Sequence, residues 1–427
     1  MENKEYRPRV VDEMLTLMLE AMGAVLIEGA KYCGKTTLAA HQAASILYMA
    51  DPETKSRNVS MAKTNISRLL AGDTPRLIDE WQLVPQLWDA VRGEVDKRGE
   101  DGQFILTGSA VAPDDSDIYH SGTGRFGWLK LRTMSLWESG DSTGEVSLGA
   151  LFDGKEFVDG TSDINLDRLA YLVCRGGWPK GVTKKSKSAA LLQAKEYFEA
   201  VTRYDISRVD NIQRDTELAK RLMRSYARLQ GSQASAGTIL NDIKVNEDDS
   251  LSESTVYSYI KALKKIFVIE DSLAWNPNLR SKTAIRTSDT RYFTDPSIAA
   301  AALGMGPEDL INDLNTFGLF FETLCVRDLR VYADALDGTV YHYRDKNELE
   351  CDAVLHLRNG KYGLIEVKLG GDELINEGAA SLLKLADKID TERMKKPSFL
   401  MVLTGIGEYA YCREDGVLVV PIGALKQ

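Results

Sequence analysis

The 427-residue sequence predicts a multidomain α/β protein, and three features along the chain indicate this. Near the N-terminus, a short apolar run leads into a glycine-rich loop and then a helix-forming stretch. The middle of the chain has the periodicity of successive amphipathic helices and an excess of basic residues. The C-terminal third alternates short apolar strands with tight turns. A chain of this length is expected to hold two to three domains.

Composition limits the class of protein. The chain is 44% hydrophobic and 27% charged, which is ordinary for a soluble globular protein. No apolar run approaches the roughly 20 residues needed to cross a bilayer, and the N-terminus lacks the apolar core of a signal peptide. The five cysteines and four histidines show no metal-ligand spacing. We therefore expect a cytoplasmic protein with reduced thiols, no structural zinc and no membrane partner.

The glycine-rich loop follows the apolar run Val25-Leu26-Ile27 and matches the pattern G-x-x-x-x-G-K-[ST]. Successive backbone N–H groups of such a loop surround phosphate oxygens at the positive end of the next helix. Lys35 is expected to reach the β- and γ-phosphates, and the Thr36 hydroxyl to help hold Mg²⁺. The pattern predicts binding of ATP or GTP. The residues expected to contact the nucleotide here are Gly29, Ala30, Lys31, Cys33, Gly34, Lys35, Thr36 and Thr37.

Two later strands end in polar residues that suit the same chemistry. Leu77-Ile78 runs into Asp79, which we expect to orient Mg²⁺, and Glu80, which we expect to polarise the attacking water. The strand ending at Leu106 is followed by Thr107 and Ser109, whose hydroxyls can sense the γ-phosphate or hold the water. An ordinary turn at the end of a strand is the alternative for these two residues.

The loop around Gly124 carries Arg125, a candidate arginine finger that could act in cis or from a neighbouring subunit. Residues 132–138 are then expected to form a strand and turn that close the first domain.

With these residues in place, the stretch from Gly29 to Glu138 resembles the bacterial and archaeal AAA-type ATPases that carry a C-terminal domain of unknown function. The matching features are Gly29–Thr36, Leu77–Glu80, Leu106–Ser109, Gly124-Arg125, Met134–Glu138 and the later Gly176-Gly177-Trp178-Pro179. The resemblance covers nearly the whole chain. It implies a homo-oligomeric ATPase followed by a winged-helix-like region and a nuclease-like end. Lys31-Tyr32-Cys33 departs from the Arg, Gln and Val common in relatives, which should not disturb a cradle made of backbone groups.

The domain boundaries that we predict are 1–145 for the ATPase domain, 146–165 for a loop-rich linker, 166–291 for a helical and winged-helix-like domain, and 292–427 for a restriction-endonuclease-like α/β domain.

The middle region is basic although the chain as a whole is acidic. Residues 180–291 hold 20 Lys and Arg against 14 Asp and Glu, a net of +6, which leaves −16 for the rest of a chain of net charge −10. This asymmetry favours DNA or RNA as a partner of residues 180–291, although a solvated helical face is an equal alternative. The basic residues include a stripe at helical spacing: Lys220, Arg221, Arg224 and Arg228.

A helix, a polar turn, a second helix over 253–266, a strand and a basic loop over 280–291 follow in the order of a winged-helix module. Its candidate recognition helix carries Thr255, Tyr259, Lys261, Lys264 and Lys265. The alternative is a module that packs against protein and never contacts DNA.

The last domain contains a D…E-x-K constellation. Asp352 and Glu366 lie seven residues either side of a hairpin turn centred near Asn359, so a regular register places them side by side. Two close carboxylates repel unless a divalent metal binds between them, and Lys368, on the same face as Glu366, could stabilise developing charge or position water. Glu322, from a predicted helix, could add a ligand. The arrangement resembles the restriction-endonuclease-like nucleases, and a surface charge network is the alternative.

These patterns together predict an ATP- and Mg²⁺-dependent AAA-type ATPase that acts on nucleic acid and has a candidate metal-dependent nuclease site. The alternative is an ATP-dependent switch or scaffold that binds a protein partner through a degenerate nuclease-like domain.

Overall fold

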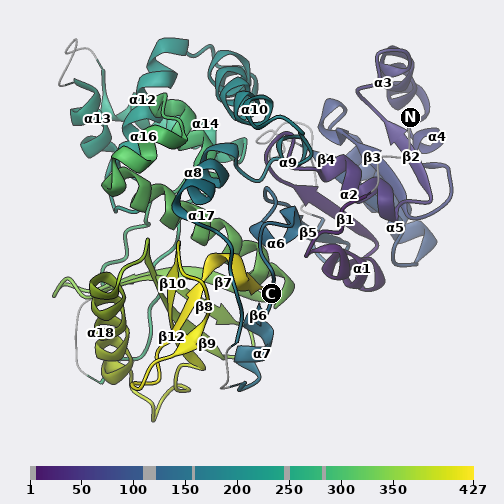
Figure 1. Cartoon of the computed structure of the whole chain (residues 1–427). Helices are drawn as coiled ribbons and strands as arrows, with labels where there is room; N and C mark the ends of the chain where they lie inside the picture. Colours follow the sequence, from purple (N-terminus) through teal and green to yellow (C-terminus); the bar gives the residue numbers. More distant parts are fainter. Residues whose placement is uncertain (1–5, 109–121, 156–158, 245–250, 281–284) are drawn as a thin grey trace. The chain divides into compact units, whose positions relative to one another are not determined.

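The computed structural model describes residues 6–108, 122–155, 159–244, 251–280 and 285–427 (Figure 1). The chain forms two compact units. The first consists of Met1–Arg132 with Ser207–Ile212 and Lys265–Phe267, and the second of Thr133–Ile206, Gln213–Lys264 and Val268–Gln427. The main segment of the first unit ends at Arg132. The predicted domain boundaries at residues 145, 165 and 291 remain predictions.

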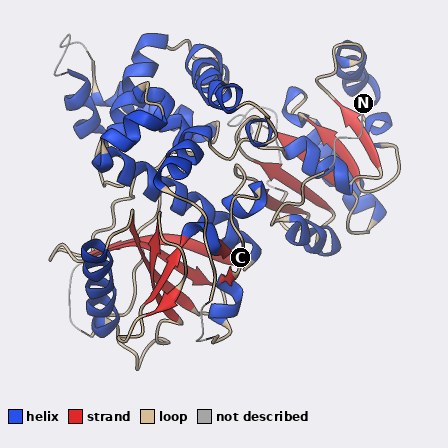
Figure 2. Ribbon diagram, viewed as in Figure 1, coloured by secondary structure: helices blue, strands red, loops and turns tan. Residues whose placement is uncertain are grey.

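The first unit is a parallel five-stranded sheet with helices on both faces, as the ribbon in Figure 2 shows. The strand order is β2-β3-β4-β1-β5. Its strands are β1 (Ala24–Glu28), β2 (Ser45–Tyr48), β3 (Arg76–Asp79), β4 (Phe104–Gly108) and β5 (Phe126–Lys130). Its helices are α1 (Asp12–Ala21), α2 (Lys35–Gln42), α3 (Lys55–Asn65), α4 (Ser67–Leu70), η1 (Trp81–Leu83) and α5 (Leu87–Arg98). The central strands are continuous apolar runs because both of their faces are covered.

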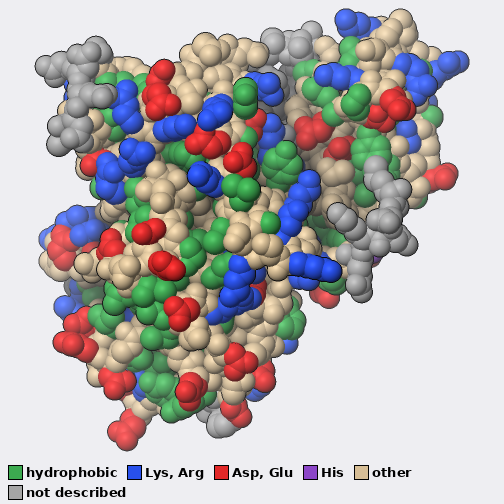
Figure 3. Space-filling model, turned by 45° about the horizontal axis from the view of Figure 1, so that its top comes forward, with side chains coloured by type: hydrophobic (Ala, Val, Ile, Leu, Met, Phe, Trp, Pro, Cys, Tyr) green, Lys and Arg blue, Asp and Glu red, His purple; other side chains and the backbone are tan. Residues whose placement is uncertain are grey.

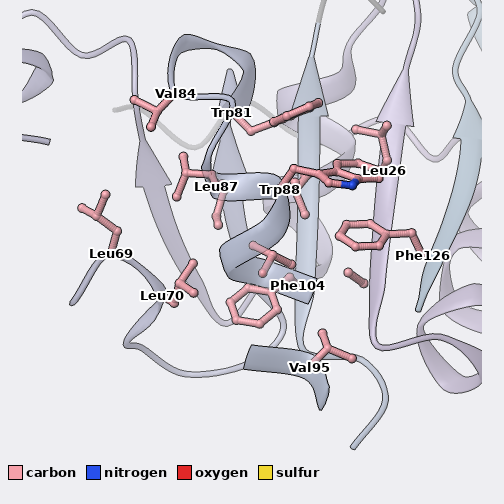
Figure 4. Close-up of a cluster of buried hydrophobic side chains, with 14 of the residues drawn as sticks. Leu26, Leu69, Leu70, Trp81, Val84, Leu87, Trp88, Val95, Phe104 and Phe126 are labelled. Atoms are coloured by element: carbon pink, nitrogen blue, oxygen red, sulfur yellow. The ribbon is translucent and has the colours of Figure 1, made fainter. Parts of the chain in front are cut away.

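One face of this sheet is held by an aromatic and aliphatic cluster (Figure 4). The Trp88 ring, from α5, stacks on Phe126 at a centroid distance of 4.0 Å, and Trp81 lies 5.2 Å from Trp88. Trp81 directly follows Asp79-Glu80, so its burial fixes the chain immediately after those two acids.

The predicted strand over residues 132–138 is wrong. The fifth strand is β5, and Met134–Glu138 instead leads into the short helix α6 (Leu136–Ser139). Ser135 and Glu138 form a reciprocal capping box, with Ser135 N donating to Glu138 Oε2 at 2.8 Å. A capping box specifies the start of a helix, and the S-x-x-E pattern was its signal.

The second unit begins with a helical part. Its elements are β6 (Val146–Ser147), α7 (Leu148–Phe152), α8 (Leu166–Arg175), α9 (Pro179–Val182), α10 (Lys187–Ala200), the π-helix η2 (Val201–Asp205), α11 (Ile206–Arg208, which runs into the first unit), α12 (Thr216–Arg228), α13 (Ala236–Lys244), α14 (Glu253–Lys265), α15 (Pro296–Leu303) and α16 (Pro307–Asn312). After α12, α13 and α14 the chain makes two antiparallel bridges, Ile269 with Phe293 and Ser272 with Thr290. Three helices followed by such a pair of strands is the order of a winged helix.

The C-terminal part of this unit is a mixed six-stranded sheet of order β11-β12-β10-β9-β8-β7. Its elements are α17 (Leu314–Ala335), β7 (Gly338–Arg344), β8 (Glu350–Leu357), β9 (Tyr362–Lys368), α18 (Asp372–Lys388), β10 (Phe399–Thr404), β11 (Tyr411–Cys412), β12 (Leu418–Pro421), η3 (Ile422–Ala424) and β13 (Leu425–Lys426), which pairs with β6. β7, β8 and β9 are antiparallel, and α18 connects β9 to the parallel β10. The predicted fold class is therefore confirmed: a parallel-sheet domain, a helical middle and a mixed-sheet end.

A buried polar network centred on Asp295 joins the start of the second unit to α17. Asp295 Oδ2 accepts from Thr133 Oγ1 at 2.7 Å, from Gly177 N at 2.9 Å and from Arg327 Nη1 at 3.2 Å. The side chain of Arg327 is 1% exposed and that of Asp295 0%, so each compensates the buried charge of the other. Gly177 is packed tightly in the same region, because a Cβ there would lie 2.1 Å from Met134 O. This close approach explains why the Gly-Gly-Trp-Pro stretch has glycine at this position.

Among the described residues, no helix is long and apolar enough to cross a bilayer.

Candidate nucleotide site and acidic cluster

The strand order brings three strand ends together in the first unit. β1 pairs with β4, with Ile27 opposite Thr107, and β4 pairs with β3, with Thr107 opposite Asp79. Because all three strands are parallel, their carboxyl ends meet at one edge of the sheet, where the loop after Glu28 also begins.

The loop itself depends on two glycines. Gly29 has φ +152°, and a Cβ there would lie 2.0 Å from Leu131 O. Gly34 has φ +109° and directly precedes α2. Only glycine adopts such conformations freely, and the result is a turn whose backbone is exposed to a ligand. The Lys35 ammonium lies over this turn, donating to Gly29 O at 2.8 Å and Ala30 O at 2.9 Å.

Asp79 connects the glycine-rich loop to the neighbouring strand β4 through hydrogen bonds. Its Oδ1 accepts from Thr36 Oγ1 and from Thr107 Oγ1, both at 2.6 Å. A threonine hydroxyl and a carboxylate within one hydrogen bond are the oxygen ligands that Mg²⁺ uses beside nucleotide phosphates. The residues present therefore fit the predicted Mg²⁺.

Glu80 follows with φ +56°, a left-handed conformation that turns its side chain away from the strand. Its Oε2 accepts a hydrogen bond from Gln82 Nε2. The sequence analysis did not include Gln82, and its position two residues after Glu80 was the only signal of this contact.

The remaining loop residues differ in how they could contact a nucleotide. Cys33 is fully buried, with Sγ 3.3 Å from Leu131 O, so only its backbone is available. Arg9 Nη1 donates to Cys33 O at 3.0 Å and so helps to hold the loop. No local sequence pattern indicated this contact. Thr37 is exposed, and Ser109 lies outside the described residues.

Arg125 does not reach the phosphate loop of its own chain. Ala24 N, at the start of β1, donates to Arg125 O at 3.0 Å, so Arg125 lies at the opposite edge of the sheet, about 13 Å of strand from Glu28. Its Nε is paired with Asp96 at 2.8 Å. The candidate role of Arg125 as an arginine finger stays a prediction.

In the second unit, β8 and β9 pair as an antiparallel hairpin, from Ala353 with Ile365 to His356 with Tyr362. Asp352 and Glu366 are the next residues beyond the end of this ladder. Asp352 Oδ2 also accepts from Val367 N at 2.7 Å. Burial, followed by the neighbouring Asp352, raises the pKa of Glu366.

Glu322 comes to the same place from α17. Burial, followed by Asp352, raises the pKa of Glu322 to about 8, and Tyr292 donates a hydrogen bond to Glu322 Oε1. The cavity beside Glu322 and Asp352 has a volume of about 20 Å³, which is room for roughly one water molecule. Tyr292 was not foreseen because it is remote in sequence.

The Lys368 ammonium lies 3.1 Å from Glu366 Oε2. Burial opposes its charge, but Asp352 and Glu366 raise the pKa of Lys368. Within the described ranges, no group of three His, Cys, Asp or Glu side chains is arranged to hold a metal. Glu322, Asp352 and Glu366 thus gather as predicted but do not form the expected three-ligand metal site.

Two of the four cations in the predicted basic stripe on α12 are paired with carboxylates. Lys220 lies 3.0 Å from Glu199, and Arg228 is paired with Asp242. On the candidate recognition helix α14, Lys264 lies 2.7 Å from Asp271, and Tyr259 is buried. These groups are poorly placed to contact phosphates.

Three family models match successive parts of the chain. Residues 22–139 match an AAA domain, and residues 166–309 and 317–425 match two different domains of unknown function. The chain thus contains an AAA domain followed by two domains of unknown function, as the resemblance implied.

Two solved structures are similar over most of the chain. The Walker-type ATPase paby2304 of Pyrococcus abyssi is 14% identical, with 70% of this chain and 97% of that chain covered and a TM-score of 0.43. Cdc6p from Pyrobaculum aerophilum is 13% identical, with 75% and 97% covered and a TM-score of 0.24. No curated protein matches.

Proposed function

Because residues 22–139 match an AAA domain, we propose that the protein hydrolyses ATP with Mg²⁺ and uses the cycle to act on nucleic acid. The observation that carries the first part is the convergence of Thr36 and Thr107 on Asp79, beside the Gly29–Gly34 loop. Three separate segments supply these groups, and a structural turn alone would not need them at one edge of the sheet.

In this proposal each residue has one task. Lys35 neutralises charge on the β- and γ-phosphates, and backbone N–H groups of the loop bind the phosphate oxygens. Thr36 and Asp79 hold Mg²⁺, which when bound neutralises charge on the phosphates. Glu80 orients the attacking water and accepts its proton, while Gln82 holds the Glu80 carboxylate in place.

The acidic cluster supports a candidate nuclease site in the C-terminal sheet. Asp352 is close enough to Glu366 to raise the pKa of its carboxyl group, and Lys368 is within hydrogen-bond reach of Glu366. If a divalent metal binds there, Asp352 and Glu366 would hold it, and it would activate the attacking water.

The test is ATP turnover with Mg²⁺, with and without DNA, for wild type and Lys35→Ala. We expect Lys35→Ala to lose at least about 100-fold in turnover, in keeping with the loss of one transition-state donor. Turnover at the wild-type rate would show that the site is assigned wrongly. For the nuclease, Asp352→Ala is compared with wild type in Mg²⁺ and Mn²⁺, and equal cleavage, or none by either, removes the catalytic role.

A second candidate is an ATP-dependent switch that binds a protein partner and has no nuclease activity. The small volume of the cavity, about 20 Å³, and the hydrogen bond from Tyr292 to Glu322 favour it. Absence of any DNA or RNA binding at low salt would support this candidate over the first. A mass measurement with ATP bound tests the proposed homo-oligomer in either case.

A further inference from the structure

The cations of the middle region fall into two groups. On α12 and α14, Lys220, Arg228 and Lys264 are paired with carboxylates, as described above. On the face shown in Figure 3, basic and acidic side chains are likewise interspersed. A polyanion therefore needs a local run of cations that the protein does not already neutralise.

Such a run lies between α9 and α10. No Asp or Glu occurs between Asp167 and Glu196, and the connection from α9 into the first turn of α10 carries three lysines: Lys184, Lys185 and Lys187. Residues 183–189 are all exposed. Among the described residues, the side chains of Lys184 and Lys185 have no ion-pair or hydrogen-bond partner.

Lys187 adds an aromatic contact to this run. Its Nζ lies 5.4 Å from the centroid of the Tyr171 ring, on α8. The ring also has the Arg168 guanidinium at 5.2 Å, but that group is paired with Asp141. The free positive charge therefore comes from the lysines of the segment itself.

The neighbours of these lysines suit phosphate groups. Thr183, Ser186 and Ser188 are hydroxyl residues, of the kind that donate to phosphate oxygens in nucleic-acid complexes. Segments that bind a membrane surface instead combine basic residues with large apolar ones, and residues 183–189 contain none.

We propose that the segment Thr183–Ser188 binds the phosphate backbone of nucleic acid without reading its sequence. This rests on the proposed action on nucleic acid and moves the contact from the winged helix to the α9–α10 connection. Each lysine that contacts a phosphate contributes about one unit to the slope of log K against log salt.

The experiment measures anisotropy of a labelled DNA duplex, with the full chain, across a salt series and in EDTA so that nothing is cleaved. The variant is Lys184→Gln, Lys185→Gln, Lys187→Gln. We expect at least tenfold weaker binding at low salt and a salt slope reduced by roughly 2–3. The matched control removes the same charge from exposed lysines elsewhere: Lys346→Gln, Lys384→Gln, Lys396→Gln. It should bind as wild type.

The outcomes separate this inference from the function on which it rests. Wild-type binding that falls equally in both triple variants overturns the inference, because only total charge matters then. If wild type binds no DNA or RNA even at low salt, the proposed nucleic-acid function fails too. Wild-type binding to phosphatidylserine vesicles that exceeds binding to DNA identifies a membrane surface and also overturns the inference. Unchanged thermal unfolding of the variant excludes misfolding.

Discussion

Gly29→Ala tests the phosphate loop through its geometry. The added Cβ would lie 2.0 Å from Leu131 O, whereas real Cβ contacts are essentially never under 3.0 Å, so the loop and the end of β5 must separate by about 1 Å. Leu131 cannot easily move, because its N–H donates to Glu28 O at 2.7 Å. A backbone strained at positive φ costs about 1–3 kcal/mol, and a lost hydrogen bond about 1 kcal/mol more. We expect a loss of about 2–4 kcal/mol from the first unit.

Two assays on Gly29→Ala check this. Thermal unfolding should shift down by roughly 6–12 °C for a unit of this size. Titration calorimetry should show ATP binding weakened at least tenfold. Gly93→Ala is the control, since a Cβ there, within α5, meets nothing within 4 Å and alanine favours a helix by about 1 kcal/mol. If Gly29→Ala binds ATP and unfolds as wild type does, the reasoning about the loop is refuted.

Three further predictions follow from single contacts. Thr107→Val removes a donor to Asp79, so steady-state ATP turnover should fall about tenfold with little change in affinity, and an unchanged rate contradicts the sensor role. Lys388→Met unpairs the buried Asp345, 2.7 Å away, and should cost about 3 kcal/mol at neutral pH in denaturant unfolding. Gly177→Ala should destabilise the second unit by about 2–4 kcal/mol in the same assay, and wild-type stability would contradict the close approach of its Cα to a backbone carbonyl.

The Lys388→Met variant also carries a pH dependence. Burial raises the pKa of Asp345, but the hydrogen bond from Lys388 and those from two backbone N–H groups outweigh it, so the pKa lies below its ordinary value. A carboxyl group whose pKa is lowered on folding contributes its full stabilisation at pH values above its pKa in the unfolded chain, about 4. This stabilisation is lost as the pH falls through the pKa of the folded state. The stability difference between wild type and variant should therefore be constant from pH 5 to 7 and shrink at about pH 3. A difference that does not shrink would rule out this pairing.

Much of the nucleotide site could be predicted from sequence because its parts are local. The glycine spacing, Lys35 and Thr36 lie within eight residues, and Asp79 ends an apolar strand. Parallel strands then bring such ends together without further information. The proximity of Asp352 to Glu366 was predictable for a similar reason, since a short hairpin fixes its own register.

The rest depends on tertiary contacts that no local pattern reports. Arg125 was placed by its neighbouring glycines, but the strand begins one residue later and takes it to the far edge of the sheet. Tyr292 reaches Glu322 across 30 residues of chain. The basic stripe on α12 has helical spacing as predicted, yet Glu199 and Asp242, from other helices, pair with two of its four cations. Spacing shows which face a charge occupies and not which partner lies opposite.

The central claim is that the Gly29–Gly34 loop, Asp79 and Glu80 form one ATP-hydrolysing site. The most direct measurement compares ATP binding and ATP turnover in Glu80→Gln, which keeps the size of the side chain and removes its charge. The account predicts ATP affinity close to wild type with turnover reduced at least about 100-fold, because Glu80 acts on the water and not on the phosphates. Turnover that stays at the wild-type rate, with ATP still bound, would contradict it.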